Sequence, residues 1–127
     1  MPLKAALIED NENNRYLLRL LLEHAGFEVV MAADGRSGVE LARREAPDVI
    51  LLDIQMPEMD GYEVAAVLKS DPEMARIPIV GVSSFAMPGD RDKALRAGFA
   101  GYIEKPVDPE RFAHSVTALL KGEKGPR

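Results

Sequence analysis

The feature that most constrains the fold of this chain is a fivefold alternation between two kinds of segment. Short apolar runs without polar alternation are typical of strands buried on both faces of a parallel sheet. Such runs span Ala5–Ile8, Glu28–Met31, Val49–Leu52, Ile79–Val82 and Gly101–Ile103. A segment with the apolar spacing of a helix follows each run, at Leu17–Ala25, Gly38–Arg44, Tyr62–Lys69, Pro88–Ala97 and Phe112–Leu120. Five strand–helix repeats predict an open, doubly wound parallel α/β sheet with helices on both faces.

The composition narrows the class of protein. The 127 residues suit one domain of ordinary size. Acidic residues outnumber basic ones by 21 to 16, and the net charge of −5 argues against a nucleic-acid partner. The sequence has no cysteine, which excludes a disulfide scaffold, a thiol nucleophile and a cysteine-based metal site. No apolar run approaches the roughly 20 residues of a membrane span, and no signal-peptide pattern opens the sequence, so we expect a cytoplasmic protein without a membrane partner.

Ligand sites of doubly wound sheets lie at the carboxyl ends of the strands. Polar side chains follow four of the five predicted strands: Glu9 and Asp10, Asp53, Ser83, and Lys105. Two carboxylates about 4 Å apart repel by about 4 kcal/mol at an effective dielectric near 20, so such a cluster binds a cation or raises a pKa. Oxygen ligands select Mg²⁺, Mn²⁺ or Ca²⁺, and a site with few protein ligands and room for phosphate oxygens favours Mg²⁺. Lys105 offsets part of the charge and is suited to holding a phosphoryl oxygen.

The nine residues after the third predicted strand, Asp53–Gly61, read D-I-Q-M-P-E-M-D-G. With the acidic pair at 9–10, the Val-Ser pair at 82–83 and the Lys-Pro pair at 105–106, they resemble the receiver domain of bacterial two-component response regulators. The resemblance covers residues 4 to about 120. Within the family the chain is most similar to single-domain regulators of the DivK-like and CheY-like type, through Glu9–Asn11 and Ser84–Met87. Asp60, near the end of the motif, is predicted to be a helix N-cap rather than a ligand.

The resemblance implies a fold and a domain organisation. The fold would be flavodoxin-like, (βα)5, with strand order 2-1-3-4-5. A receiver domain would span residues 1–121 and a short polar tail residues 122–127, with no output domain.

The resemblance also assigns a role to each residue at the strand ends. Asp53 would accept the phosphoryl group, while Ser83 and Lys105 would bind its oxygens. The ligands of Mg²⁺, or of Mn²⁺ in its place, would be Glu9, Asp10, Asp53 and the backbone carbonyl of Gln55.

Further residues complete the family pattern. Ser83 and Tyr102 would form a switch in which the tyrosine turns inward as the serine moves toward the phosphate. The peptide bond between Lys105 and Pro106 would be cis. Gln55 and Phe85 occupy the positions that tune phosphate lifetime, and a bulky residue at 85 predicts slow loss of the phosphoryl group.

The implied function is a signalling switch rather than a conventional enzyme. The donor would be a phosphohistidine of a histidine kinase or of a histidine phosphotransfer protein, and a downstream protein would read the altered surface. Dimerisation on phosphorylation stays open. So do two alternatives: a receiver fragment of a hybrid kinase or larger regulator, and a degenerate receiver that acts only as an interaction module.

Two unrelated functions fit the sequence less well. A phosphatase of the haloacid dehalogenase type expects a second aspartate at position 55, where this chain has glutamine. A flavin or nucleotide binder on the same fold expects a G-x-G-x-x-G or a Walker loop, and neither motif occurs in the sequence.

Overall fold

A computed structural model describes residues 2–84 and 87–120, which form ten alternating elements. The strands are β1 (Lys4–Ile8), β2 (Glu28–Ala32), β3 (Val49–Asp53), β4 (Ile79–Ser83) and β5 (Gly101–Glu104). The helices are α1 (Glu12–His24), α2 (Gly35–Glu45), α3 (Gly61–Ser70), α4 (Asp90–Arg96) and α5 (Pro109–Leu120). The predicted alternation of strand and helix is confirmed. The predicted tail at 122–127 lies outside the described residues.

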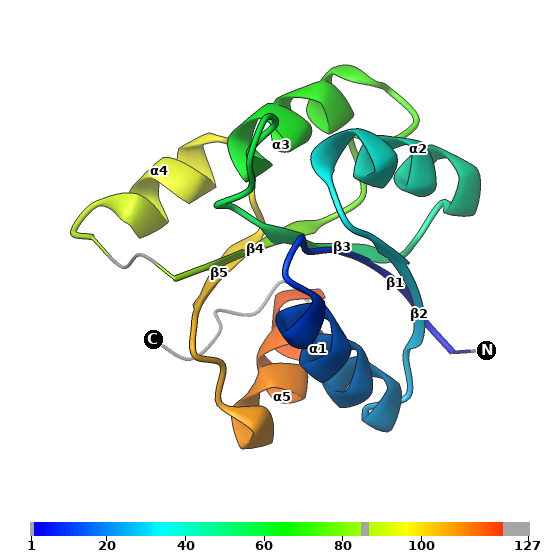
Figure 1. Cartoon of the computed structure of the whole chain (residues 1–127). Helices are drawn as coiled ribbons and strands as arrows, with labels where there is room; N and C mark the ends of the chain where they lie inside the picture. Colours follow the sequence, from blue (N-terminus) through cyan, green and yellow to red (C-terminus); the bar gives the residue numbers. More distant parts are fainter. Residues whose placement is uncertain (1, 85–86, 121–127) are drawn as a thin grey trace.

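The five strands form one parallel sheet in the order β2-β1-β3-β4-β5, which confirms the expected order. The order reverses between β1 and β3, because the chain first adds β2 on one side of β1 and then crosses to the other side. Helices α1 and α5 cover one face, and α2, α3 and α4 cover the other (Figure 1). A ligand site is therefore expected at the carboxyl ends of β1 and β3.

The sheet separates two apolar cores, which explains why the strands lack polar alternation. Leu18 and Leu22 of α1 pack with Phe112 and Val116 of α5 against one face. On the other face the core includes residues of all three covering helices, such as Leu41, Val64, Leu68 and Ala94. Every residue of β3 and of β4 is buried. Because both strands are central and covered on both sides, their carboxyl ends are held rigidly.

The residues just before α2 and α4 explain where the predicted bounds of these helices were wrong. The Asp34 side chain accepts from the Ser37 N–H, so α2 begins at Gly35, three residues before the predicted start. Helix α4 is shorter than predicted, since Gly89 precedes it with a left-handed φ of 91°. Asp60 is the N-cap of α3, as predicted. No helix in the described part of the chain has the length and apolar character that crossing a bilayer requires.

Candidate functional site

Three carboxylates meet where β1 and β3 end. Ile8 pairs with Leu52 in the sheet, so the residues that follow each strand emerge side by side. Oxygens of Glu9, Asp10 and Asp53 all lie within 4.8 Å of one another. Glu9 and Asp53 are 1% and 4% exposed, whereas Asp10 faces solvent. The cluster is thus a buried negative centre that opens to solvent at Asp10.

The Lys105 ammonium supplies positive charge from the end of β5. Its Nζ lies 2.8 Å from Glu9 Oε1 and 3.5 Å from Asp53 Oδ1. The other oxygen of Glu9, Oε2, accepts from the Asn11 N–H at 3.0 Å. The peptide bond between Lys105 and Pro106 is cis. One ammonium faces three carboxylates, so the fully ionised site keeps an excess of negative charge.

This excess shows in the protonation of Asp53. Burial raises the pKa of the Asp53 carboxyl to about 8, and hydrogen bonding with Glu9 and Asp10 and the charge of Glu9 add to the effect. Lys105 acts in the opposite direction but does not cancel these contributions. At neutral pH the cluster therefore retains a proton unless another cation neutralises it. A hard divalent cation with oxygen ligands is the kind of ion that suits this donor set.

Gln55 connects the end of β3 to the end of β4. It does so through its backbone N–H and through both polar atoms of its side-chain amide. Its backbone N–H donates to Asp53 Oδ1 at 3.2 Å. Its side-chain Nε2 donates to Ser83 Oγ at 2.5 Å, and its Oε1 accepts from the Ser84 N–H at 3.0 Å. Ser83 is 1% exposed, so its hydroxyl is held inside the site rather than at the surface.

The loop from β3 to α3 lies close against the end of β3. The Gly61 N–H donates to the Ile54 carbonyl at 2.9 Å. A Cβ at position 61 would lie 2.7 Å from Ile54 Cα and 2.9 Å from the Asp53 carbonyl oxygen, so glycine is required for this approach. Asp60 and Glu63 form a capping box at the start of α3. The Asp60 carboxylate is engaged there, which supports its interpretation as a cap and not a ligand.

Tyr102 of β5 is buried, with 5% of its surface exposed, and it packs in the core under α3 and α4. The guanidinium of Arg91, on α4, lies 5.7 Å from the centre of its ring. Tyr102, which is expected to act as a switch, thus occupies an inward position. Phe85, the other residue expected to tune phosphate lifetime, lies outside the described residues.

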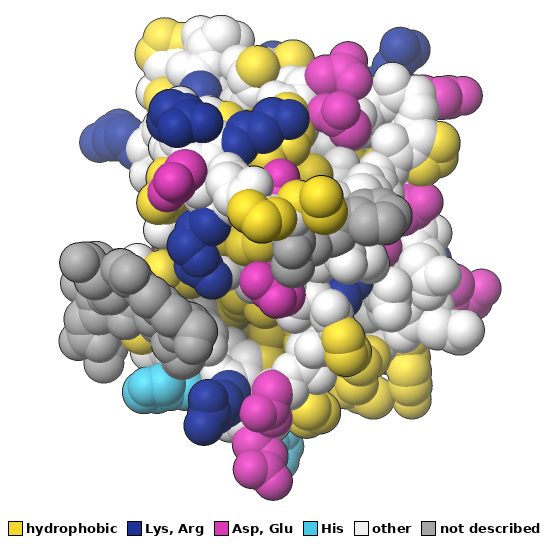
Figure 2. Space-filling view, turned by 90° about the vertical axis from the view of Figure 1, so that its left-hand side faces the viewer, with side chains coloured by type: hydrophobic (Ala, Val, Ile, Leu, Met, Phe, Trp, Pro, Cys, Tyr) yellow, Lys and Arg dark blue, Asp and Glu magenta, His cyan; other side chains and the backbone are white. Residues whose placement is uncertain are grey.

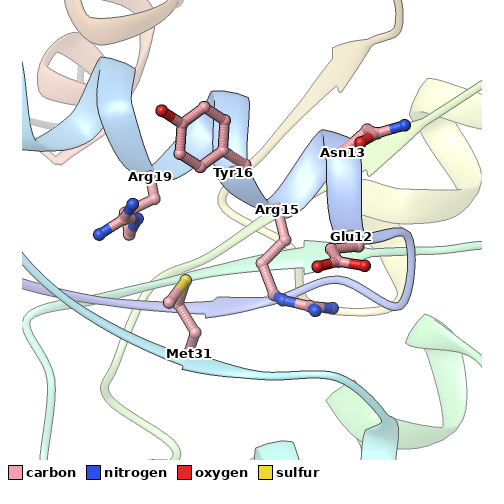
Figure 3. A pocket seen from close by; sticks show the side chains of 6 residues that line it. All are labelled: Glu12, Asn13, Arg15, Tyr16, Arg19 and Met31. Atoms are coloured by element: carbon pink, nitrogen blue, oxygen red, sulfur yellow. The ribbon is translucent and has the colours of Figure 1, made fainter.

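Arg15 supports the loop that carries Glu9 and Asp10. Its Nη1 donates to the Glu9 carbonyl at 2.8 Å and lies 3.5 Å from the Asp10 carbonyl. The side chain belongs to a hollow of about 310 Å³ between α1 and β2 (Figure 3). Arg19 lines the same hollow with its guanidinium 5.4 Å from the Tyr16 ring centre. Both arginines are therefore engaged within the chain, and the hollow borders the acidic loop rather than forming a second site.

Sequence reasoning found the strand-end residues but missed three contacts around them. These are the side-chain bonds of Gln55, the support from Arg15, and the Arg91 guanidinium over Tyr102. The position of Gln55, two residues after Asp53, was the available signal, but it predicted a metal-binding backbone carbonyl and an effect on phosphate lifetime rather than these side-chain bonds. The other two contacts join side chains whose proximity depends on how the loops fold, and the sequence carries no comparable signal for them.

Comparison with known proteins places the chain in one class, the receiver domains of response regulators. The family model of the response regulator receiver domain matches residues 5–117. The chain belongs to the response regulator receiver domain family. Members of this family interact with histidine kinases and with downstream targets, and they bind Mg²⁺ in the active site.

Individual relatives agree with this placement. The polar-differentiation response regulator DivK of Brucella anthropi is 41% identical over 120 residues, which cover 94% of this chain and 98% of that protein. The chemotaxis protein CheY4 of Vibrio cholerae superposes with a TM-score of 0.88 at 27% identity, over 94% of this chain and 99% of that one. The receiver domain of the sensor histidine kinase PA1611 of Pseudomonas aeruginosa has a TM-score of 0.86 at 29% identity, over 95% and 99% of the two chains. That structure holds a magnesium ion coordinated in its active-site cleft.

Proposed function

We propose that Asp53 accepts a phosphoryl group from a phosphohistidine of a histidine kinase or a histidine phosphotransfer protein, and that the acyl phosphate switches a protein-binding surface. The observation that carries the proposal is the convergence of strand ends on Asp53. Asp53 is buried, its Oδ1 is 3.5 Å from Lys105 Nζ, and it lies within 4.8 Å of two other carboxylates.

The transfer exchanges one bond to phosphorus for another. A carboxylate oxygen of Asp53 bonds to phosphorus while the phosphorus–nitrogen bond of the donor breaks and leaves its electron pair on the imidazole nitrogen. Such a reaction needs positioning and charge stabilisation more than covalent help from the protein. The Lys105 ammonium is placed to pair with a phosphoryl oxygen on Asp53, and the Ser83 hydroxyl is placed to donate to another.

The acidic cluster fits a divalent cation. We assign Glu9, Asp10, Asp53 and the Gln55 backbone carbonyl as the residues that would hold Mg²⁺, or Mn²⁺ in its place. The raised pKa of Asp53, about 8, supports this assignment, because the cluster already retains a proton to relieve its charge. When bound, the cation neutralises the carboxylates and the phosphoryl oxygens. The exposed Asp10 supplies the side from which the ion enters.

The surface that a downstream protein would read surrounds Tyr102. Helix α4 carries three basic residues and, between them, an exposed Leu95. Basic and hydrophobic side chains gather on the corresponding part of the molecule (Figure 2). Arg91 connects this surface to the buried switch ring. A change at Ser83 or Tyr102 therefore has a direct route to the face formed by α4 and β5.

The test is intact-mass analysis after incubation with a small acyl phosphate donor, with and without Mg²⁺. Wild type, Asp53→Asn and, as a matched control, Asp92→Asn on the exposed side of α4 are compared. We expect one phosphoryl adduct that requires Mg²⁺, persists in Asp92→Asn and is lost in Asp53→Asn. If no adduct forms, a phosphohistidine donor replaces the acyl phosphate. Failure with both donors would leave a degenerate interaction module as the better description.

The lifetime of the acyl phosphate is a separate part of the proposal. Phe85 and Gln55 occupy the positions expected to tune this lifetime, and the bulk of Phe85 is expected to slow the attack of water on the phosphoryl group. Hydrolysis of the phosphorylated protein should therefore be faster in Phe85→Ala than in wild type. Equal rates in the two proteins would contradict the role of Phe85.

A further inference from the structure

The Gln55 side chain forms hydrogen bonds with the Ser83 hydroxyl and with the backbone N–H of Ser84. We call these contacts the Gln55 clasp, which consists of Nε2 donating to Ser83 Oγ and Oε1 accepting from the Ser84 N–H. The chemistry of Ser84 fixes the orientation of the amide, because a backbone N–H can only donate and must face the oxygen of Gln55. The nitrogen of Gln55 is then directed at the Ser83 hydroxyl.

The clasp joins Ser83 to the loop that follows Asp53. Gln55 lies two residues after Asp53, and its own N–H donates to the Asp53 carboxylate at 3.2 Å. Its side chain thus ties Ser83 to the loop that carries the acceptor. The Ser83 oxygen has two acceptor positions and one hydrogen, and Gln55 uses an acceptor position. The Gln55 amide therefore does not use the hydroxyl hydrogen.

Ser83 and Tyr102 lie on neighbouring strands of the sheet. Ser83 ends β4, and Tyr102 lies on β5 opposite Gly81 of β4. Tyr102 is 5% exposed and is packed among core residues. A serine drawn toward the acceptor and a tyrosine turned inward are the two halves of the switch expected on phosphorylation. Here Gln55 supplies a contact between Ser83 and the loop that follows Asp53.

We propose that Gln55 is a positioning residue that pre-sets the switch: through Ser83 it favours the inward position of Tyr102 before phosphorylation. The inference rests on the proposed function, since it concerns how the same site is regulated. It goes beyond an effect on phosphate lifetime, because it acts on the conformational equilibrium of the protein. The phosphoryl group would then stabilise an arrangement that the clasp already favours.

The test follows the reactivity of individual tyrosines toward tetranitromethane, read by peptide mass spectrometry. The chain has three tyrosines, and their environments differ. Tyr16 is 58% exposed and reports full reactivity, while Tyr62 on α3 reports general loosening of the α3–α4 region. The variant is Gln55→Met, which keeps the length of the side chain and the backbone N–H but removes both clasp bonds.

We expect unphosphorylated wild type to nitrate Tyr102 much more slowly than Tyr16. In Gln55→Met the Tyr102 rate should rise by about two- to tenfold, the population shift that one net hydrogen bond supports. Tyr62 should not change. Addition of Mg²⁺ and beryllofluoride, a phosphoryl mimic, should return Tyr102 of Gln55→Met to the slow rate, and the further substitution Asp53→Asn should prevent this return.

The clasp itself has a direct spectroscopic signature, because Gln55 is the one glutamine in the sequence. With ¹⁵N-labelled glutamine, its side-chain amide signals should move in Ser83→Ala and stay in place in Ser83→Thr, which keeps the hydroxyl. Unmoved signals in Ser83→Ala would overturn the clasp.

Three results would overturn the role in the switch. They are fast nitration of Tyr102 in wild type, an unchanged Tyr102 rate in Gln55→Met, and an equal rise at Tyr62. If beryllofluoride affects no variant, the proposed function fails, whereas the comparison between unphosphorylated wild type and Gln55→Met still decides whether Gln55 sets the position of Tyr102.

Discussion

Replacing Asp53 by asparagine should stabilise the metal-free protein by an amount that grows with pH. The Asp53 side chain is buried, and its surroundings raise the pKa of the carboxyl from 3.8 to about 8. A folded-state pKa above the unfolded one means that folding takes up a proton between these values. The stabilisation from that proton is fully present below about pH 4 and is lost as the pH rises through about 8. Asparagine has no charge to bury and does not suffer this loss.

The two pKa values set the size of the effect. A difference of about 4 between them corresponds to on the order of 5 kcal/mol over the whole titration. By the linkage relation, wild type should lose about 2 to 3 kcal/mol of its unfolding free energy between pH 5 and pH 7. The gain in unfolding free energy from Asp53→Asn should therefore grow by about that amount over the same range. Above about pH 8 the gain should level off, because the folded carboxyl is then ionised as well.

The assay is urea unfolding followed by circular dichroism, in the presence of a chelator, at unit steps from pH 5 to pH 9. Asp92→Asn serves as the matched control, since it makes the same replacement at an exposed position of α4. Saturating Mg²⁺ at pH 8 should stabilise wild type more than Asp53→Asn, because the ion binds the native carboxylates. If the gain in unfolding free energy from Asp53→Asn is constant or falls as the pH rises, the raised pKa of the Asp53 carboxyl is refuted.

Three further predictions test other parts of the structure. Lys105→Met removes the cation 2.8 Å from Glu9, so Mg²⁺ should bind more tightly by calorimetry while phosphorylation of Asp53 slows; weaker Mg²⁺ binding would contradict the charge argument. Asp60→Ala removes the capping box of α3 and should lower the free energy of unfolding, measured in urea, by about 1 kcal/mol. An unchanged free energy of unfolding would mean that solvent replaces the cap. Gly38→Ala should destabilise by about 1 to 3 kcal/mol, because its Cβ would lie 2.6 Å from Cδ1 of the buried Ile8; a stabilised variant would show that this core can yield.

The fold could be predicted because its strands are buried on both sides. Residues such as Ile50 and Leu51 point to opposite faces, and both are fully buried, so the apolar run is unbroken. The helix bounds were less predictable, since they depend on single caps. Asp34 draws the start of α2 to Gly35, and Gly89 delays the start of α4 to Asp90. Both residues are ordinary turn formers in a sequence, and only the path of the chain decides which neighbour they cap.

The acidic cluster could be predicted because sheet topology brings strand ends together regardless of side-chain detail. Register alone places Glu9 beside Asp53 once β1 and β3 are neighbours. The clasp could not be predicted in the same way. Whether the Gln55 side chain turns toward Ser83, toward solvent or toward a bound ion depends on the torsion angles of one loop. Sequence spacing constrains the backbone path and leaves those angles undetermined.

Lys105 offsets only part of the negative charge of this site. Three carboxylates and one ammonium carry a formal charge of −2 when all are ionised. A proton on Asp53 reduces that charge, and a divalent ion held by the three carboxylates would take the place of the proton and balance the rest. A phosphoryl group on Asp53 then brings new negative charge of about 1.5 to 2, as phosphate monoesters do. Lys105 is the nearby cation that can turn from Glu9 to meet it, since its Nζ already lies 3.5 Å from Asp53. Phosphorylation should therefore release the Glu9–Lys105 pair and shift the Lys105 ammonium signals in NMR spectra, whereas unchanged signals would mean that Lys105 stays with Glu9.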